Sequence, residues 1–150
     1  MPILTVNERG GFTHVINVSF TELQAIGTGN SRTIFTLPAG AAVELVGIVK
    51  TTQVVGSSST VIDIGYTGVP LAFISGWDAD GATTGLPVYN TGTDFVQVAG
   101  NTTVKGGSLP VRAVSAATAV TLRVTDAALA SITAGSFVIA IRVLDISRFA

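Results

Sequence analysis

The chain has 150 residues, 47% of them hydrophobic, with no cysteine and a formal net charge of −1. This length supports one domain with a sizeable core, and the lack of cysteine excludes disulfides, thiolate metal sites and cysteine nucleophiles. The balanced charge gives no basic surface for nucleic acid or anionic lipid. Charged residues make up only 11%, against about 25% in ordinary soluble proteins. Two interpretations stay open: a surface covered by partner subunits, or a neutral surface rich in hydroxyl groups.

The first eleven residues precede the first clear strand pattern and form a segment of their own. Residues 1–11 carry three apolar side chains, Ile3, Leu4 and Val6. They are expected to form either an N-terminal arm that reaches a partner, as in strand addition, or a short edge strand of the chain's own sheet. In the first case these three side chains belong to a partner interface.

Residues 12–150 are expected to form a single antiparallel β-sandwich. Alternating apolar and polar residues predict half-buried strands, and stretches that are apolar on both faces predict central ones. The alternating stretches are 12–20, 60–66 and 120–125, the doubly apolar ones are 32–37, 43–50 and 137–146, and short candidates lie at 95–98 and 111–114. No sustained 3.6-residue period is present, so the only helical feature expected is a turn at 127–132 capped by Asp126. The longest apolar stretches, 41–49 and 137–144, are too short to span a membrane.

Residues 65–101 show little alternation and are expected to form a long loop excursion from the sandwich. Such excursions commonly carry recognition. Phe73, Trp77 and Tyr89 lie within it and are the candidate partner-interface residues, as a sugar-binding platform or a protein hot spot. The alternative is that these rings plug the open end of the sandwich.

No set of residues predicts catalysis, so the chain is not expected to be an enzyme, and no cofactor is expected. The single histidine, His14, falls on the apolar face of the first strand and is expected to be a packed, hydrogen-bonded core residue rather than a base. Asp78-Ala79-Asp80-Gly81 resembles the start of a calcium loop, but Ala82 and Tyr89 stand where further ligands are needed. An ordinary Asx turn is favoured, so no metal ligand is assigned, although calcium binding at Asp78 and Asp80 stays open.

The order of several segments is similar to that of a known family. Residues 33–41, with Leu37-Pro38-Ala39-Gly40, lead into the strand 43–49, and a Ser-rich turn precedes a strand that ends in Ile64-Gly65. The segments 120–124 and 135–145 form a closing strand pair. Over roughly residues 30–146 this order resembles small β-sandwich proteins of tailed-bacteriophage virions, in particular capsid decoration or cement proteins.

The resemblance implies a jelly-roll-like subunit that is made in the host bacterial cytoplasm and sits on the outer capsid surface. It implies binding to the major capsid protein, self-association as a homodimer or homotrimer, and stabilisation of contacts between capsid subunits. It implies no nucleic-acid or membrane partner. Phage tail and fibre modules use similar sandwiches, so a tail protein or a receptor- or carbohydrate-binding module is the alternative.

Overall fold

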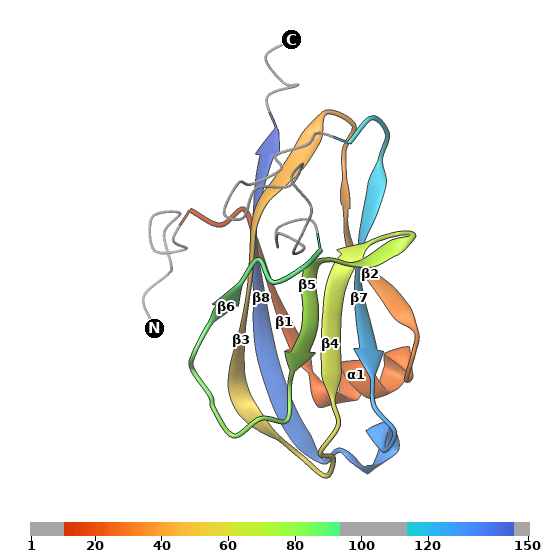
Figure 1. Cartoon of the computed structure of the whole chain (residues 1–150), viewed down its shortest axis with the longest axis vertical. Coiled ribbons are helices and arrows are strands. Elements are labelled where there is room, and N and C mark those ends of the chain that lie inside the picture. The colour runs from red at the N-terminus through yellow and green to blue at the C-terminus, as the bar shows by residue number, and fades with distance from the viewer. Residues whose placement is uncertain (1–10, 94–113, 146–150) are drawn as a thin grey trace, which may run out of the picture.

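Two four-stranded antiparallel sheets pack face to face in the computed structural model, which describes residues 11–93 and 114–145 (Figure 1). The elements are β1 His14–Ser19, α1 Phe20–Ile26, β2 Ser31–Leu37, β3 Ala41–Val55, β4 Val61–Tyr66, β5 Val69–Asp78, β6 Val88–Tyr89, β7 Thr118–Thr125, the 3-10 helix η1 Leu129–Ser131 and β8 Ala134–Asp145. Sheet A has the order β1-β8-β3-β6, and sheet B has the order β2-β7-β4-β5. The predicted all-β antiparallel sandwich is confirmed.

The strand order is that of a jelly roll. The first strand pairs with the last, β1 with β8 in sheet A, and the second strand pairs with the next to last, β2 with β7 in sheet B. The inner strands then add beside them, β3 next to β8 and β4 next to β7. This nested order, shared by the two sheets, corresponds to the double-sheet jelly-roll arrangement.

The core lies between the sheets and is built from alternate residues of each strand. On β1 the burial alternates as the sequence pattern predicts, with Thr13, Val15 and Asn17 exposed and the residues between them half-buried or buried. The largest fully buried side chains come from both sheets and from α1: Phe137, Leu23, Leu37, Ile48, Ile62, Ile64, Ile74, Leu122, Ile139, Ile141, Val46 and Val120. Burying such side chains contributes about 1.5–3 kcal/mol each relative to leaving them exposed.

One helix was not predicted. The strand expected over 12–20 ends at Ser19, and α1 begins at Phe20. The backbone N–H of Ser19 donates to the Glu22 carboxylate at 2.8 Å, which is half of a capping box, and Leu23 is 1% exposed. The helix is two turns long, too short for a sustained period to appear in the sequence. Within residues 11–93 and 114–145, no helix has the length and hydropathy that crossing a membrane would require.

The long excursion predicted over 65–101 is wrong in its first part. Residues 69–78 form β5, which pairs with β4 along its whole length. Its register shifts between Ile64 and Tyr66 and again between Ile62 and Ile64, and Gly76 has a φ of +65°. These irregularities break the two-residue period by which a strand is recognised in the sequence.

The chain continues from β6 to cover the edge of β5. The backbone N–H of Gly92 donates to the carbonyl of Phe73 at 2.7 Å, and that of Thr93 to the carbonyl of Leu71 at 2.8 Å. A Cβ at position 92 would lie 2.2 Å from the carbonyl oxygen of Ala72, so this close approach requires glycine. The strand candidate 95–98, most of 111–114 and the segment 1–10 lie outside the described residues.

Candidate docking surface

A row of small and apolar residues crosses all four strands of sheet A on its outer face. Residues that lie directly opposite one another in adjacent strands share a face of the sheet. The register aligns four of them in one row: Val15, Ala140, Gly47 and Tyr89. The alternation on β1 places this row on the side that faces away from the core, because Val15 is 46% exposed.

A second row extends the apolar region by one step along the strands. It consists of Asn17, Val138 and Val49. Phe12 and Pro87 adjoin both rows and help to line a hollow of about 280 Å³ with Gly47, Tyr89, Val138 and Ala140. We call this region the apolar face: Phe12, Val15, Gly47, Val49, Pro87, Tyr89, Val138 and Ala140.

Tyr89 lines this hollow and lies against the backbone of β3 at Gly47. A Cβ on Gly47 would come within 2.6 Å of Cε1 of Tyr89, so the ring can lie close to β3 only because residue 47 is glycine. Tyr89 is nevertheless 48% exposed. An aromatic ring held in place and half open to solvent presents contact area at a low cost in side-chain entropy.

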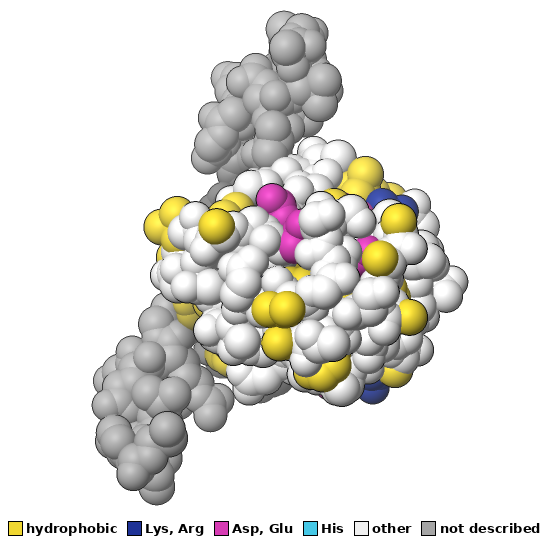
Figure 2. Space-filling view, turned by 90° about the horizontal axis from the view of Figure 1, so that it is seen from below, with side chains coloured by type: hydrophobic (Ala, Val, Ile, Leu, Met, Phe, Trp, Pro, Cys, Tyr) yellow, Lys and Arg dark blue, Asp and Glu magenta, His cyan; other side chains and the backbone are white. Residues whose placement is uncertain are grey.

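Polar groups border the apolar face at both ends of the strands. Arg142 and Glu44 approach to 3.6 Å on one side, and the hydroxyls of Thr51 and Ser136 lie 2.7 Å apart on the other. An apolar centre with a polar rim is the usual anatomy of a protein–protein interface. The end of the sandwich seen from below consists mainly of backbone and uncharged polar side chains, with scattered hydrophobic and a few charged side chains among them (Figure 2).

The three predicted interface residues that the structure describes do not come together on one surface. Tyr89 lies on the apolar face, but Phe73 and Trp77 are 6% and 9% exposed and belong to the core. The Trp77 ring packs edge-on against Phe137 with centroids 5.3 Å apart, and the Phe73 ring packs at 5.7 Å from Tyr66. The prediction of a sugar-binding platform made of three rings is therefore wrong, because the rings of Phe73 and Trp77 pack in the core. Ile3, Leu4 and Val6 lie outside the described residues.

His14 has the packed and hydrogen-bonded environment that was predicted, at the margin of the core rather than inside it. It is half-buried on the inner face of β1. Its ring stacks on Phe35 with centroids 4.6 Å apart, and Nδ1 lies 2.9 Å from the hydroxyl oxygen of Thr13. These contacts account for the residue without a catalytic role.

The Asp78–Gly81 segment forms the Asx turn that was favoured. One carboxylate oxygen of Asp78 accepts hydrogen bonds from the backbone N–H of Asp80 at 3.1 Å and of Gly81 at 2.8 Å. Lys50, 3% exposed, donates its ammonium to the carbonyl of Gly81. Burial lowers the pKa of Lys50, while the charges of Asp78 and Asp80 act against that shift. Within the described residues, no group of three His, Cys, Asp or Glu side chains could hold a metal ion.

We expect calcium to leave the stability of the protein unchanged, because the buried Lys50 already supplies a positive charge beside this turn. The measurement compares the thermal midpoint of unfolding in excess EDTA with the midpoint in excess calcium. Binding to the folded state would raise the midpoint by mass action. A calcium-dependent rise that Asp78→Asn abolishes would contradict this expectation and place a metal site at the turn.

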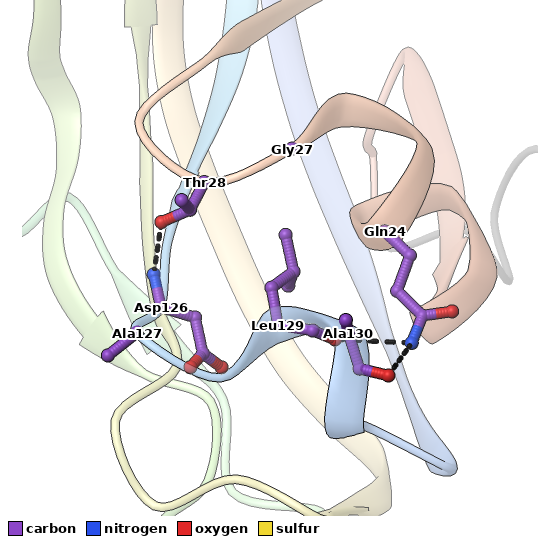
Figure 3. Close-up of a pocket in the computed structure, with 7 residues that line it drawn as sticks. All are labelled: Gln24, Gly27, Thr28, Asp126, Ala127, Leu129 and Ala130. Carbon is purple, nitrogen blue, oxygen red and sulfur yellow. Dashed lines mark hydrogen bonds between the residues drawn. The ribbon is translucent and has the colours of Figure 1, made fainter.

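A hollow of about 530 Å³ lies between α1 and η1, and its polar groups are bound to one another (Figure 3). The hydroxyl of Thr28 accepts the backbone N–H of Asp126 at 2.8 Å. The amide of Gln24 donates to the carbonyls of Leu129 at 3.1 Å and Ala130 at 3.4 Å. These bonds hold the loops around Thr28 and Asp126 and the helix η1 against α1. We call this contact the joint; its polar groups bond one another and are not free to bind a ligand.

Asp126 is the centre of this joint. Its carboxylate accepts the hydroxyls of Ser57 at 2.8 Å, Ser59 at 3.2 Å and Thr60, and the backbone N–H of Ala128 at 2.7 Å. Asp126 is 1% exposed. The helical turn expected at 127–132 is present as η1, but its N-cap is Ala128, which has no side-chain cap; Asp126 bonds the N–H of Ala128 just before η1 and does not cap the helix itself. A carboxylate with four donors has little capacity left for chemistry.

Asp63 is similarly engaged, although the alternation placed it on a solvent-facing side. Its side chain is 4% exposed and pairs with Arg123, with 2.8 Å between Oδ2 and Nη2. The other oxygen accepts the backbone N–H of Gly76 at 2.7 Å, which ties down the irregular part of β5. The ion pair and this bond hold sheet B together, so Asp63 is a structural residue.

Comparison with known proteins gives a likeness in structure. No protein-family model matches the chain, and no curated protein matches it. A chain of the "Cyanophage Pam1 capsid asymmetric unit" has a similar structure, with a TM-score of 0.57. The sequences are 22% identical, and the match covers 85% of this chain and 79% of that chain. The two chains share a fold.

Proposed function

We propose that the chain is a structural protein of a phage virion, a decoration or cement subunit that binds the outside of the head through the apolar face. The observation that carries the proposal is the fold shared with a chain of a cyanophage capsid asymmetric unit over 85% of the residues. The segment order of the sequence supports the same class independently. The partner is the major capsid protein, and the location is the outer surface of the virion.

The apolar face supplies the contact. It exposes Val15 and Tyr89 at 46% and 48%, so burying their remaining surface contributes about 1 kcal/mol each, since full burial of a large apolar side chain contributes about 1.5–3 kcal/mol. A single contact of this size is weak. Many copies arranged by the symmetry of a shell act together, so expansion or rupture of the shell would have to break all of these contacts.

The role is physical rather than enzymatic. Among the described residues, His14, Asp63 and Asp126 are each engaged in packing or in a saturated set of hydrogen bonds. A subunit that bridges neighbouring capsid proteins stabilises them by the area that it buries, and no cofactor takes part in the proposed mechanism.

Substitution of Tyr89 and Val138 by lysine tests the surface. We expect Tyr89→Lys/Val138→Lys to lower occupancy on particles assembled without the chain at least about tenfold, because burying two unpaired charges is costly. Occupancy is measured by co-sedimentation. The matched control is Thr67→Lys, at an exposed position in the turn between β4 and β5 of sheet B, which should bind as the unaltered chain does.

Two results would contradict the proposal. Full occupancy by the double variant would mean that another surface makes the contact, provided that circular dichroism shows both variants folded. Specific signals on a glycan array would instead favour the receptor- or carbohydrate-binding alternative, for which the burial of Trp77 leaves no aromatic platform.

A further inference from the structure

Sheet A ends at β1, and the free edge of β1 has unpaired backbone groups. In an antiparallel ladder, successive residues direct their N–H and C=O groups alternately toward the partner strand and away from it. The N–H of Ser19 is turned away from β8, since it donates to Glu22. Val15 and Asn17, four and two residues earlier, therefore direct their N–H and C=O groups outward as well. Within the described residues, neither has a backbone hydrogen bond on that side.

The other strands of the sheet give the same assignment. The backbone groups of Val46 in β3 point toward β6, since its carbonyl accepts the N–H of Asn90 at 3.0 Å. Its neighbour Gly47 therefore faces β8 and bonds Ala140, which is opposite it. Ala140 cannot also bond β1, so Val15, its partner there, has its own groups directed to the free edge.

The edge of β1 lacks the usual protection against strand pairing. Natural edge strands are commonly protected by lysine, proline, bulges or a covering segment. The edge of β5 has such a cover in residues 91–93. β1 reads His-Val-Ile-Asn-Val-Ser, with no proline and no Asp, Glu, Lys or Arg. Glu22 of α1 bonds the outward N–H of Ser19 at the end of the strand, but within the described residues no backbone segment hydrogen bonds the outer side of Val15 and Asn17.

The core is also open along this side of the sandwich. A hollow of about 140 Å³ between β1 and β2 is lined by Ile16, Ile26 and Ile34, together with polar residues that include Glu22 and Arg32. A second hollow of about 290 Å³ continues along the same side beside His14 and Phe35. The three isoleucines, His14 and Phe35 are half-buried, so a further strand at this edge would place more of their surface out of water.

We propose that a second copy of this chain occupies the edge, with the two β1 strands antiparallel across a two-fold axis at Ile16. The free residues Val15 and Asn17 lie symmetrically about Ile16, so the edge is complementary to itself. Val15 then pairs with Asn17 of the partner subunit and Asn17 pairs with the partner's Val15. This uses every free N–H and C=O group of these two residues in both copies, as an isologous interface requires.

β1 itself carries no Asp, Glu, Lys or Arg, which favours a second copy over other occupants, because no like charges of the two β1 strands meet across the axis. Pairing joins the two A sheets into one of eight strands, from two sheets of four. The row that contains Val15, Ala140, Gly47 and Tyr89 then continues into the second copy, so the apolar face doubles in width. The inference does not rest on the proposed function, and it concerns the chain in the absence of capsids.

Proline at position 17 tests the pairing, with alanine as its matched control. Proline is tolerated on an edge strand where the N–H faces solvent, so Asn17→Pro removes an outward donor without breaking the β1–β8 ladder. We expect sedimentation equilibrium to give a dimer for the unaltered chain and for Asn17→Ala, and a dissociation constant at least about tenfold higher for Asn17→Pro. A monomer for the unaltered chain at about 100 µM, which means a millimolar or weaker constant, would overturn the proposal, as would a dimer for Asn17→Pro of unchanged strength.

A charge exchange tests the register and remains informative if Asn17→Pro does not fold. In Val15→Glu/Asn17→Glu, glutamates face each other twice across the axis, so dimerisation should weaken at least about tenfold. In Val15→Lys/Asn17→Glu, each lysine faces a glutamate, and the dimer should be restored. Equal dimerisation by the two double variants would overturn the register. Loss of capsid binding by Tyr89→Lys/Val138→Lys leaves this result unaffected, so the two proposals fail separately.

Discussion

Replacing Trp77 with alanine is expected to lower the free energy of unfolding by about 3–5 kcal/mol, the range for deleting a buried aromatic ring. The ring is 9% exposed, packs edge-on against Phe137, and lies 5.7 Å from the ammonium of Lys50. The substitution removes both contacts and leaves a cavity next to Phe137. Urea denaturation followed by circular dichroism measures the loss.

Tyr89→Ala is the matched control for Trp77→Ala. It also removes an aromatic ring from the segment once expected to be a loop, but Tyr89 is 48% exposed. Its loss should cost less than about 1 kcal/mol, as for most surface substitutions. Equal and small losses in the free energy of unfolding for both variants would mean that Trp77 is not part of the core. The hypothesis of an aromatic platform would then be open again.

Asp126→Ala is expected to cost about 3 kcal/mol or more, because it leaves several buried donors without an acceptor. The hydroxyl of Thr60, a residue that is 0% exposed, loses its partner, as does the backbone N–H of Ala128. Thr125→Ala, at the exposed neighbouring position, controls for a change at the end of β7 and should be nearly neutral. A loss of less than 1 kcal/mol for Asp126→Ala, the order of a surface substitution, would mean that the joint does not hold the loops.

The pH dependence of this difference gives an independent check. Burial acts to raise the pKa of Asp126, but the hydrogen bonds from Thr60, Ala128, Ser57 and Ser59 outweigh it and hold the pKa below its ordinary value. A carboxyl whose folded pKa is lowered stabilises the protein above its unfolded pKa of about 3.9, and that stability is lost as the pH falls through the folded pKa. The difference between the unaltered chain and Asp126→Ala should be constant from about pH 5 to 8 and shrink below about pH 4. A difference that grows on acidification would contradict the assignment.

The sandwich could be predicted from the sequence because β1, β4 and β7 alternate between apolar and polar residues, while β2, β3 and β8 are apolar on both faces. On β1 the exposed residues Thr13, Val15 and Asn17 alternate with inward ones as the pattern requires. The alternation failed for β5, where register shifts and Gly76 interrupt the period. The helix α1 was signalled only by Ser19 and Glu22, a capping pair three residues apart, which carries less information than a period does.

The candidate surface was less predictable, because it depends on register. Tyr89 was among the residues expected at an interface, but nothing in the sequence distinguishes it from Trp77, which the irregular β5 turns into the core. Gly47, Val138 and Ala140 join Tyr89 only because β3, β8 and β6 are adjacent and aligned. Strands distant in the chain meet in this way by topology, which a single sequence does not specify.

Cryo-electron microscopy of phage particles from the source of the chain tests the central claim most directly. The account predicts density for this jelly roll on the outside of the head, with the apolar face around Tyr89 against the major capsid protein. Density confined to the tail, or heads without the chain, would contradict it.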